Sequence, residues 1–400
     1  MDLICSSTKC TGCGACVNIC SQKCIKLVEK KGFYHPFIDE QKCISCNLCK
    51  KICPGNTKYL NKNQNLNPIV IAGYSKEKNF LQKSTSGGFF SIIAEYVINK
   101  NGIVFGAVMD SNLNVFHKKA CNMEQIEKMR GSKYIQSDTK YTFQEVKKNL
   151  NDGKYVLYSG TPCQIAGLYK YLNNKDYNNL ITIDLVCHGV GSKELFSKYI
   201  KYLENKYKNQ IIEIRFRSKK RGYLKFTVEI TFKSGKKVYI KSLNDIYMSM
   251  YYKKGIYRES CYSCEYAKIP RVGDFTIGDF LELDINSRIY KEAKNKGISL
   301  ILINNKKGIE VFDKIKEKLE YEERTLNEAI SSSYNLSNST IMPKYRDSIL
   351  SDEQDDIKKI QLKYCKRLKR EYIADIIGSD SIRKIQRRLG LNKWIRKENY

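Results

Sequence analysis

Residues 10–20 read CTGCGACVNIC and place four cysteines, Cys10, Cys13, Cys16 and Cys20, at spacings of two, two and three residues. Residues 43–53, CISCNLCKKIC, repeat this spacing with Cys43, Cys46, Cys49 and Cys53, and Pro54 follows directly. Three closely spaced thiolates bind three corners of a 4Fe–4S cube, and the fourth cysteine of each run reaches the other cube. The repeat therefore predicts an α+β, ferredoxin-like domain with two clusters over residues 1–60.

The spacing also predicts which cysteines share a cluster. The first cluster is expected to use Cys10, Cys13, Cys16 and Cys53, and the second Cys43, Cys46, Cys49 and Cys20. Gly12 and Gly14 suit a chain wound closely around a cube. Zinc is the alternative, but a zinc ion needs only four ligands and does not require a remote fourth cysteine. Cys5 and Cys24 fall outside both runs and are expected to be packing residues.

The composition bounds the class of protein. A chain of 400 residues exceeds one average domain. Its N-terminus has no basic segment leading into an apolar one, which favours a cytoplasmic protein whose sixteen cysteines are ligands rather than disulfides. The formal charge of +29 attracts acidic proteins, anionic lipid or nucleic acid without selecting among them, so no specific nucleic acid is expected.

Beyond a polar linker at 58–68, short apolar runs alternate with amphipathic stretches. Strands are expected at 69–75, 103–109, 154–160, 180–187 and 297–304, and helices at 86–102 and 162–172. This alternation predicts an α/β domain with a largely parallel sheet over residues 61–345, in two parts at about 69–150 and 151–320. Residues 211–240 are richer in strand-forming residues.

Residues 346–400 are expected to form a basic helical tail. From Ile357 to Tyr400 the chain carries 14 Lys and Arg against 4 acidic residues. One interpretation is a solvated helical extension. The alternative is an amphipathic helix on an anionic membrane, with Ile385, Leu389 and Trp394 facing the lipid.

Four further cysteines predict a third redox site. Cys163 lies just past a predicted strand, Cys187 ends another, and Cys261 and Cys264 form a spaced pair. The crevice beyond the carboxyl ends of parallel strands is where ligands bind, and four thiolates suffice for a third 4Fe–4S cluster. The alternative is two structural cysteines and a zinc half-site with His188.

Two polar stretches are candidates for phosphate binding. Ser84, Thr85, Ser86, Gly87 and Gly88 open a predicted helix with backbone amides and hydroxyls, although a serine N-cap explains the same pattern. In RGSKYIQS, at 130–137, Arg130 and Lys133 offer positive charge for the same anion. A solvated loop is the alternative there.

The order of the motifs along the chain resembles that in the beta subunit of coenzyme F420-reducing hydrogenase and dehydrogenase. The motifs are S-T-S-G-G, G-S-K-Y-I-Q-S, G-T-P-C-Q, D-L-V-C-H-G and C-x2-C…G-D-F. Hydroxymethyl-chlorophyll reductase of plants belongs to the same family, and the resemblance covers about residues 5–320. The resemblance implies an iron–sulfur flavoprotein that binds FAD. It also implies a cluster held by Cys163, Cys187, Cys261 and Cys264. The FAD contacts that it implies are Ser84, Thr85, Ser86, Gly87, Gly88, Arg130, Gly131, Ser132, Lys133 and Tyr134. Leu281, Glu282 and Leu283 follow G-D-F where Trp and Gly are expected in members that use deazaflavin, so the substrate is coenzyme F420-like or another.

These observations predict an FAD-dependent iron–sulfur oxidoreductase. A flavin exchanges a hydride as two electrons and passes electrons singly to clusters. The expected partners are a redox protein, either a ferredoxin or a catalytic subunit, and a small-molecule redox substrate. His188 either donates a proton to that substrate or caps its loop. The alternative function is a non-catalytic electron-transfer subunit that couples a partner enzyme to ferredoxin.

Overall fold

A computed structural model of the chain describes residues 4–57, 65 and 67–365. Its N-terminal unit contains α1 (Ala15–Ile19), β1 (Ile25–Lys30), β2 (Phe33–Ile38) and α2 (Leu48–Ile52), with β1 and β2 paired as an antiparallel hairpin. Half of the buried side chains in its small core are cysteines; the others are Ile4, Val17 and Ile25. A core this small contributes little stability by itself.

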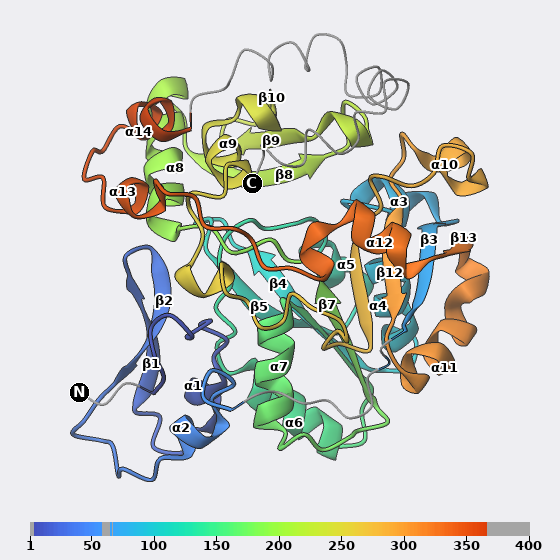
Figure 1. The fold of residues 1–400 in the computed structure, drawn as a ribbon, viewed down its shortest axis with the longest axis horizontal. Helices are drawn as coiled ribbons and strands as arrows, with labels where there is room; N and C mark the ends of the chain where they lie inside the picture. The colour runs from blue at the N-terminus through green and yellow to red at the C-terminus, as the bar shows by residue number, and fades with distance from the viewer. Residues whose placement is uncertain (1–3, 58–64, 66, 366–400) are drawn as a thin grey trace.

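An eight-stranded sheet forms the centre of the molecule, in the order β13-β3-β12-β11-β7-β6-β4-β5 (Figure 1). Its strands are β3 (Ile69–Ser75), β4 (Ile103–Met109), β5 (Val115–Ala120), β6 (Val156–Gly160), β7 (Leu180–Leu185), β11 (Phe275–Asp279), β12 (Ser299–Ile303) and β13 (Leu319–Arg324). The expected parallel pairing is found among β4, β6, β7 and β11. The outer strands pair antiparallel, because β5, for example, returns directly from β4 without a crossover helix.

Helices cover both faces of this sheet. One face carries α4 (Phe89–Ile98), α5 (Met123–Glu127) and α11 (Lys306–Ile315), and the other carries α6 (Thr142–Asn151), α7 (Pro162–Tyr171), α10 (Arg288–Ala293) and α12 (Leu326–Ser332). The strand β12 shows the alternation: Ile301 and Ile303 pack on the first face, and Leu300 and Leu302 on the second. A strand that is buried on both faces has an almost continuously apolar sequence.

A second, three-stranded antiparallel sheet follows from the β-rich stretch: β8 (Ile211–Ser218), β9 (Thr227–Phe232) and β10 (Lys237–Lys241). It packs with α8 (Lys193–Tyr207), α9 (Ile246–Tyr252), α13 (Arg346–Leu350) and α14 (Ile357–Tyr364). The segment expected to form a tail therefore begins inside the core, because Ile349, Ile357, Ile360 and Cys365 are buried there. Ile385, Leu389 and Trp394 lie outside the described residues, as does most of the linker at 58–68.

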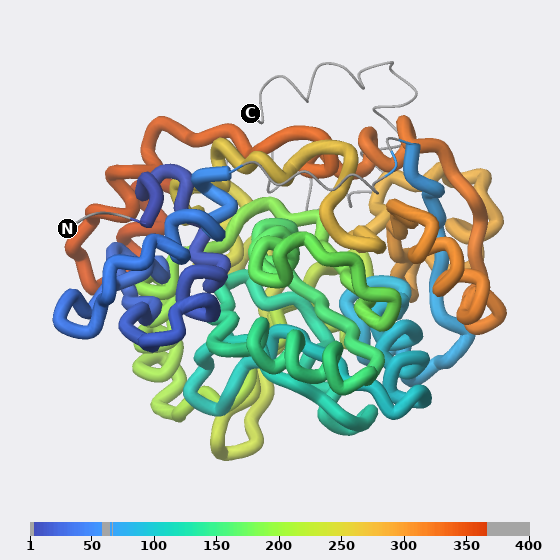
Figure 2. Tube along the Cα trace, turned by 90° about the horizontal axis from the view of Figure 1, so that it is seen from below, coloured from blue at the N-terminus to red at the C-terminus, as the bar shows by residue number. Residues whose placement is uncertain are grey.

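The N-terminal unit lies at one end of the molecule, against α6 and α7 (Figure 1). The orthogonal view places it at the opposite end from the orange segments around α10 and α11 (Figure 2). Of the helices described, not one is long and apolar enough to cross a bilayer. The N-terminal unit thus meets the α/β domain at the helix that carries Cys163.

Candidate redox centre and ligand cleft

The first group of cysteines surrounds a small cavity at the base of the N-terminal unit. Cys10, Cys13, Cys16 and Cys53 line it, together with Cys5. Burial, followed by the neighbouring sulfur of Cys53, raises the pKa of Cys13 to about 12. The Cys5 thiol lowers the pKa of Cys10 to about 4 by hydrogen bonding to it. The four predicted ligands of the first cluster are thus together, and Cys5 is a fifth thiol beside them rather than a packing residue alone.

The second group lies at the outer end of the same unit. Burial, and then the nearby sulfurs of Cys46 and Cys43, raise the pKa of Cys49. Cys20 Sγ lies 3.3 Å from Cys24 Sγ, so this group too holds a fifth thiol. Residues 44–48 are all exposed, Cys46 among them, whereas residues 12–17 of the first loop are buried. The two cysteine runs have identical spacing, but the loop of the first is buried and that of the second is exposed to solvent.

The third group gathers at the carboxyl ends of the parallel strands. Cys163 is in the first turn of α7, where Thr161 Oγ1 lies 3.1 Å from its Sγ, and Cys187 lies two residues beyond β7. Burial, and then the sulfurs of Cys261, Cys163 and Cys264, raise the pKa of Cys187 well above its usual range. The four predicted ligands of a third cluster therefore share one site.

Each of the three groups offers four thiols, which is the donor set of a 4Fe–4S cluster. Across the part of the chain that the structure describes, no three His, Cys, Asp or Glu side chains converge closely enough to hold one metal ion. Cube ligands bind four different irons and stay farther apart than the ligands of one tetrahedral zinc ion. His188 is accordingly not drawn into a compact set with Cys187.

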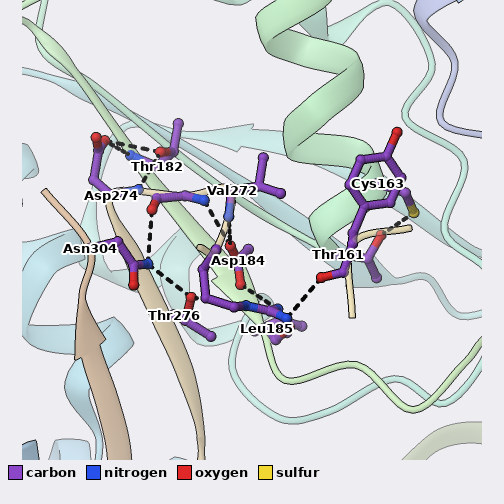
Figure 3. A network of polar contacts seen from close by, with 12 residues as sticks. Thr161, Cys163, Thr182, Asp184, Leu185, Val272, Asp274, Thr276 and Asn304 are labelled. Atoms are coloured by element: carbon purple, nitrogen blue, oxygen red, sulfur yellow. Dashed lines mark hydrogen bonds and ion pairs between the residues drawn. The ribbon is translucent and has the colours of Figure 1, made fainter. Parts of the chain in front are cut away.

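A buried ion pair supports the third group (Figure 3). Arg271 Nη2 lies 2.8 Å from Asp184 Oδ1, and both side chains are fully buried. The same guanidinium donates to the carbonyls of Leu185, at 3.0 Å, and Tyr266, at 2.9 Å. Leu185 precedes Cys187 by two residues, and Tyr266 follows Cys264 by two. The Arg271 side chain therefore holds the two segments that carry these cysteines. Neither Arg271 nor Asp184 was among the predicted site residues, although Asp184 opens the D-L-V-C-H-G motif.

A cleft of about 1790 Å³ opens between the central and second sheets. Six predicted FAD contacts line it: Ser84, Thr85, Arg130, Gly131, Ser132 and Lys133. Basic side chains dominate its wall, namely Lys76, Lys78, Lys83, Lys118, Lys119, Lys128, Arg130, Lys133, Arg215, Arg217, Lys219, Lys220 and Lys296, against five acidic ones.

Arg130 is a buried cation of this cleft with donors that are not satisfied. Its side chain is only 4% exposed, and its Nε and Nη1 have no hydrogen-bond partner. The carboxylate of Glu127 lies 3.8 Å from Nη1, but it is already bound by Lys83. A buried guanidinium with unsatisfied donors in a basic cleft fits an anionic group.

Four predicted FAD contacts have other surroundings. Ser86 Oγ donates to Ile298 O at 2.7 Å, and the Gly87 amide donates to Ser299 Oγ at 2.9 Å. A Cβ on Gly87 would lie 2.3 Å from Gly73 O, so this glycine is required for close packing against the sheet. Gly88 has φ +93 and begins α4. The Tyr134 ring packs on that of Tyr251.

Lys133 lines the cleft but is occupied by the chain itself. Its Nζ donates to the carbonyls of Lys128, Met129 and Arg130 at 2.9–3.1 Å. Burial lowers its pKa to about 7. Lys133 therefore satisfies the carbonyl groups that follow α5, and Arg130 is the cation of this loop with donors left to offer.

Tyrosine rings connect the cleft to the third group. Arg217, on the cleft wall, donates to Tyr134 Oη at 3.3 Å. The Tyr134 ring lies 4.7 Å from that of Tyr251, which lies 4.7 Å from that of Tyr257. The Tyr257 ring packs directly on Gly189, two residues beyond Cys187. The distance from the cleft to the third group is thus spanned by a short run of packed rings.

His188 lies at this junction. Burial lowers its pKa, and a hydrogen bond with Asn335 opposes the shift. Its backbone carbonyl accepts from Thr340 Oγ1 at 2.6 Å. The loop is therefore held by the backbone of His188.

The first and third groups meet where the N-terminal unit contacts α7. A Cβ on Gly167 of α7 would lie 2.9 Å from Cys13 Sγ, four residues along the helix from Cys163. Gln136 Nε2 donates to Thr11 O at 3.2 Å, and Thr139 Oγ1 donates to Cys13 O at 3.0 Å. Gln136 of the G-S-K-Y-I-Q-S motif, and Thr139 just beyond the motif, thus bind the N-terminal unit. The sequence contains one indication of this contact, the glycines Gly12 and Gly14 of the first cysteine run.

A cysteine-built N-terminal unit, a third cysteine group and a basic cleft define an iron–sulfur redox protein. Residues 9–57 match the 4Fe-4S dicluster domain, and residues 153–329 match the family described as the C terminus of the coenzyme F420 hydrogenase/dehydrogenase beta subunit. Residues 153–329 thus belong to this beta subunit family, and the dicluster domain precedes them in the chain.

Individual proteins are similar to all or part of this chain. An uncharacterised protein of Methanocaldococcus jannaschii is 23% identical over 334 residues, which cover 76% of this chain and 85% of that protein. An uncharacterised protein from the rpl9–rpl11 intergenic region of Porphyra purpurea is 36% identical over 59 residues, 14% of this chain and 79% of its own length. The F420-reducing [NiFe] hydrogenase complex of Methanosarcina barkeri contains a chain with TM-score 0.48 and 17% identity, covering 70% of this chain and 90% of that one.

Proposed function

We propose that the protein is an FAD-dependent iron–sulfur oxidoreductase that passes electrons between its dicluster domain, a third 4Fe–4S cluster, FAD and a hydride-exchanging substrate. The observation that carries the proposal is the continuity of these sites. Cys13 of the first group packs on the helix of Cys163, and tyrosine rings span from the third group to the cleft. Electrons that enter at the N-terminal unit thus have a connected route to the cleft.

The cleft residues support an FAD site. Arg130 would pair with the pyrophosphate, and Thr85 and Ser132, whose Oγ1 and amide nitrogen are 3.1 Å apart, would supply further polar contacts. FAD supplies the exchange between a hydride and single electrons. His188, which follows Cys187 directly, would hold or return a proton for the substrate.

The iron count tests the third cluster. Protein purified without oxygen is expected to contain about twelve irons per chain, and Cys163→Ser about eight with the ferredoxin signal intact, because serine is a weaker and harder ligand. Cys121→Ser is the matched control, since Cys121 is an exposed cysteine on the cleft wall outside all three groups. Wild-type protein with eight irons, or with zinc in place of four, would contradict the third cluster.

Flavin content tests the cleft. Arg130→Gln is expected to lose FAD and keep its iron, because a buried guanidinium facing an anion is removed. Gly87→Asp does not test phosphate binding, since any side chain at Gly87 meets the backbone of Gly73. Lys119→Gln is the control, because Lys119 is an exposed lysine on the same cleft wall. This variant should keep its flavin.

The alternative, a non-catalytic electron-transfer subunit, uses the same clusters. The exposed loop at 44–48 favours a protein partner in either case, a ferredoxin or a catalytic subunit. Reduction of a dye by the purified chain with NAD(P)H or reduced coenzyme F420 separates the two functions. Activity with either donor supports the oxidoreductase, and its absence in fully loaded protein supports the electron-transfer subunit.

A further inference from the structure

Arg258 is a buried cation at the contact between the N-terminal unit and the α/β domain, only 2% exposed. Its Nε donates to Cys10 O at 2.6 Å, and its Nη1 donates to Tyr34 O at 2.8 Å and Gln136 Oε1 at 3.2 Å. Its Nη2 lies 3.4 Å from His35 Nδ1. None of these four partners is a carboxylate.

The backbone of Arg258 belongs to the third group. Its amide donates to Val190 O at 3.1 Å, three residues beyond Cys187, and its carbonyl accepts from the Cys261 amide at 3.0 Å. The residue thus holds the Cys187 and Cys261 loops through its main chain and the Cys10 loop through its side chain. Its positive charge favours the thiolate form of Cys10, Cys163 and Cys261.

Arg271 provides a comparison within the same site. It is equally buried, but Asp184 neutralises it at 2.8 Å. A buried charge without a counter-ion is costly, and attraction to an anion is strong where water is excluded. Each cluster held by four thiolates carries net negative charge, so the first and third clusters are the anions that Arg258 faces.

We propose that Arg258 is a positioning residue that holds one uncompensated positive charge between the first and third clusters and raises the reduction potential of both. The proposal rests on the proposed function, because it requires clusters in both groups. Reduction adds negative charge to a cluster, so a nearby cation stabilises the reduced form. The second cluster lies at the far end of the N-terminal unit and serves as a control inside the same molecule.

Redox titration followed by electron paramagnetic resonance tests the proposal, with Cys163→Ser identifying the signal of the third cluster. In Arg258→Gln, the potentials of the first and third clusters should shift to more negative values while the second stays unchanged. Arg258→Lys keeps the charge and should keep most of the wild-type potential. A purely structural role predicts that lysine and glutamine disturb the site alike.

Gln136→Glu provides a second variant if Arg258→Gln fails to fold or to load iron. It retains Arg258 and sets a carboxylate beside Nη1, which should lower the same two potentials. Unchanged potentials in iron-replete Gln136→Glu protein, or equal shifts of all three clusters, would overturn the proposal. An eight-iron wild-type protein would instead refute the third cluster, and the shift of the first cluster would still be measurable.

Discussion

At the scale of single residues, His117 on β5 is a histidine that the folded chain keeps neutral. Its Nδ1 lies 2.8 Å from Ser137 Oγ and its Nε2 3.0 Å from Ser159 O, so Nε2 donates to the carbonyl and Nδ1 accepts. Burial lowers its pKa from 6.5 to about 4. The unfolded chain therefore binds this proton at higher pH than the folded chain does, and stability falls as the pH decreases from 6.5 toward 4.

We therefore expect wild-type protein to lose about 1 kcal/mol more unfolding free energy than His117→Gln between roughly pH 7.5 and 5.5. Urea unfolding without oxygen at both pH values measures the difference. Parallel pH profiles for the two proteins would show that His117 does not titrate differently on folding.

Gly14 illustrates a second effect at this scale, the close approach of a side chain to the backbone. Its φ is +81, and a Cβ there would lie 2.0 Å from Thr139 Oγ1. Gly153 also has a positive φ, of +74, but a Cβ there would meet nothing within 4 Å. Gly153→Ala should cost about 1 kcal/mol of stability, whereas Gly14→Ala should cost more and also lower the iron content. Equal stability and iron content in the two variants would contradict this role of Gly14.

At the scale of elements, α14 is part of the core although its sequence resembles the start of a basic tail. Ile360 is fully buried among residues of α8 and α9, whereas Leu362 on the same helix is 51% exposed. Ile360→Ala is expected to cost about 2–4 kcal/mol of unfolding free energy, and Leu362→Ala less than about 0.5 kcal/mol. Thermal or urea unfolding of both variants checks the contrast. Equally small losses of unfolding free energy in the two variants would show that α14 lies outside the cooperative unit.

Elements with strong local signals were predicted well. The strands expected at 69–75 and 103–109 are β3 and β4, because apolar runs that follow a Pro or a Gly mark them. The third cysteine group joins Cys163, Cys187 and Cys261, which are far apart in the sequence, so the spacing of cysteines does not by itself predict this group. Arg258 could not be predicted, because its partner Cys10 is 248 residues away and nothing in ESCYSC indicates a contact. The antiparallel pairing of β3 with β12 and β13 and the packing role of Gly87 likewise depend on distant neighbours.

At the scale of the whole molecule, the two dicluster runs differ in access. The α/β domain covers the first, and the second presents Ile44 and Leu48, 62% and 46% exposed, with Lys51 alongside. Exposed apolar residues with basic neighbours suit an acidic redox protein. Leu48→Asp is expected to slow reduction by an acidic ferredoxin roughly tenfold, about 1.4 kcal/mol, without changing reduction by dithionite.

Ile309→Asp is the control for this surface, because Ile309 is 38% exposed on α11, outside the N-terminal unit. Its reaction with ferredoxin should match wild type. Raised ionic strength should slow the wild-type reaction, since attraction between exposed charges is screened. An unchanged rate in Leu48→Asp would move the docking surface elsewhere.

The contact between Arg258 and Cys10 also implies an order of biogenesis. The N-terminal unit is translated first, and Arg258 leaves the ribosome some 200 residues later, roughly 10–40 s at ordinary elongation rates. During that interval the first loop is uncovered and open to iron–sulfur delivery. In the folded chain Arg258, Gln136 and Thr139 bind this loop and Cys13 is buried, so we expect a carrier protein to reach Cys13 only before they pack. The nascent chain is thus the form best suited to receive the first cluster.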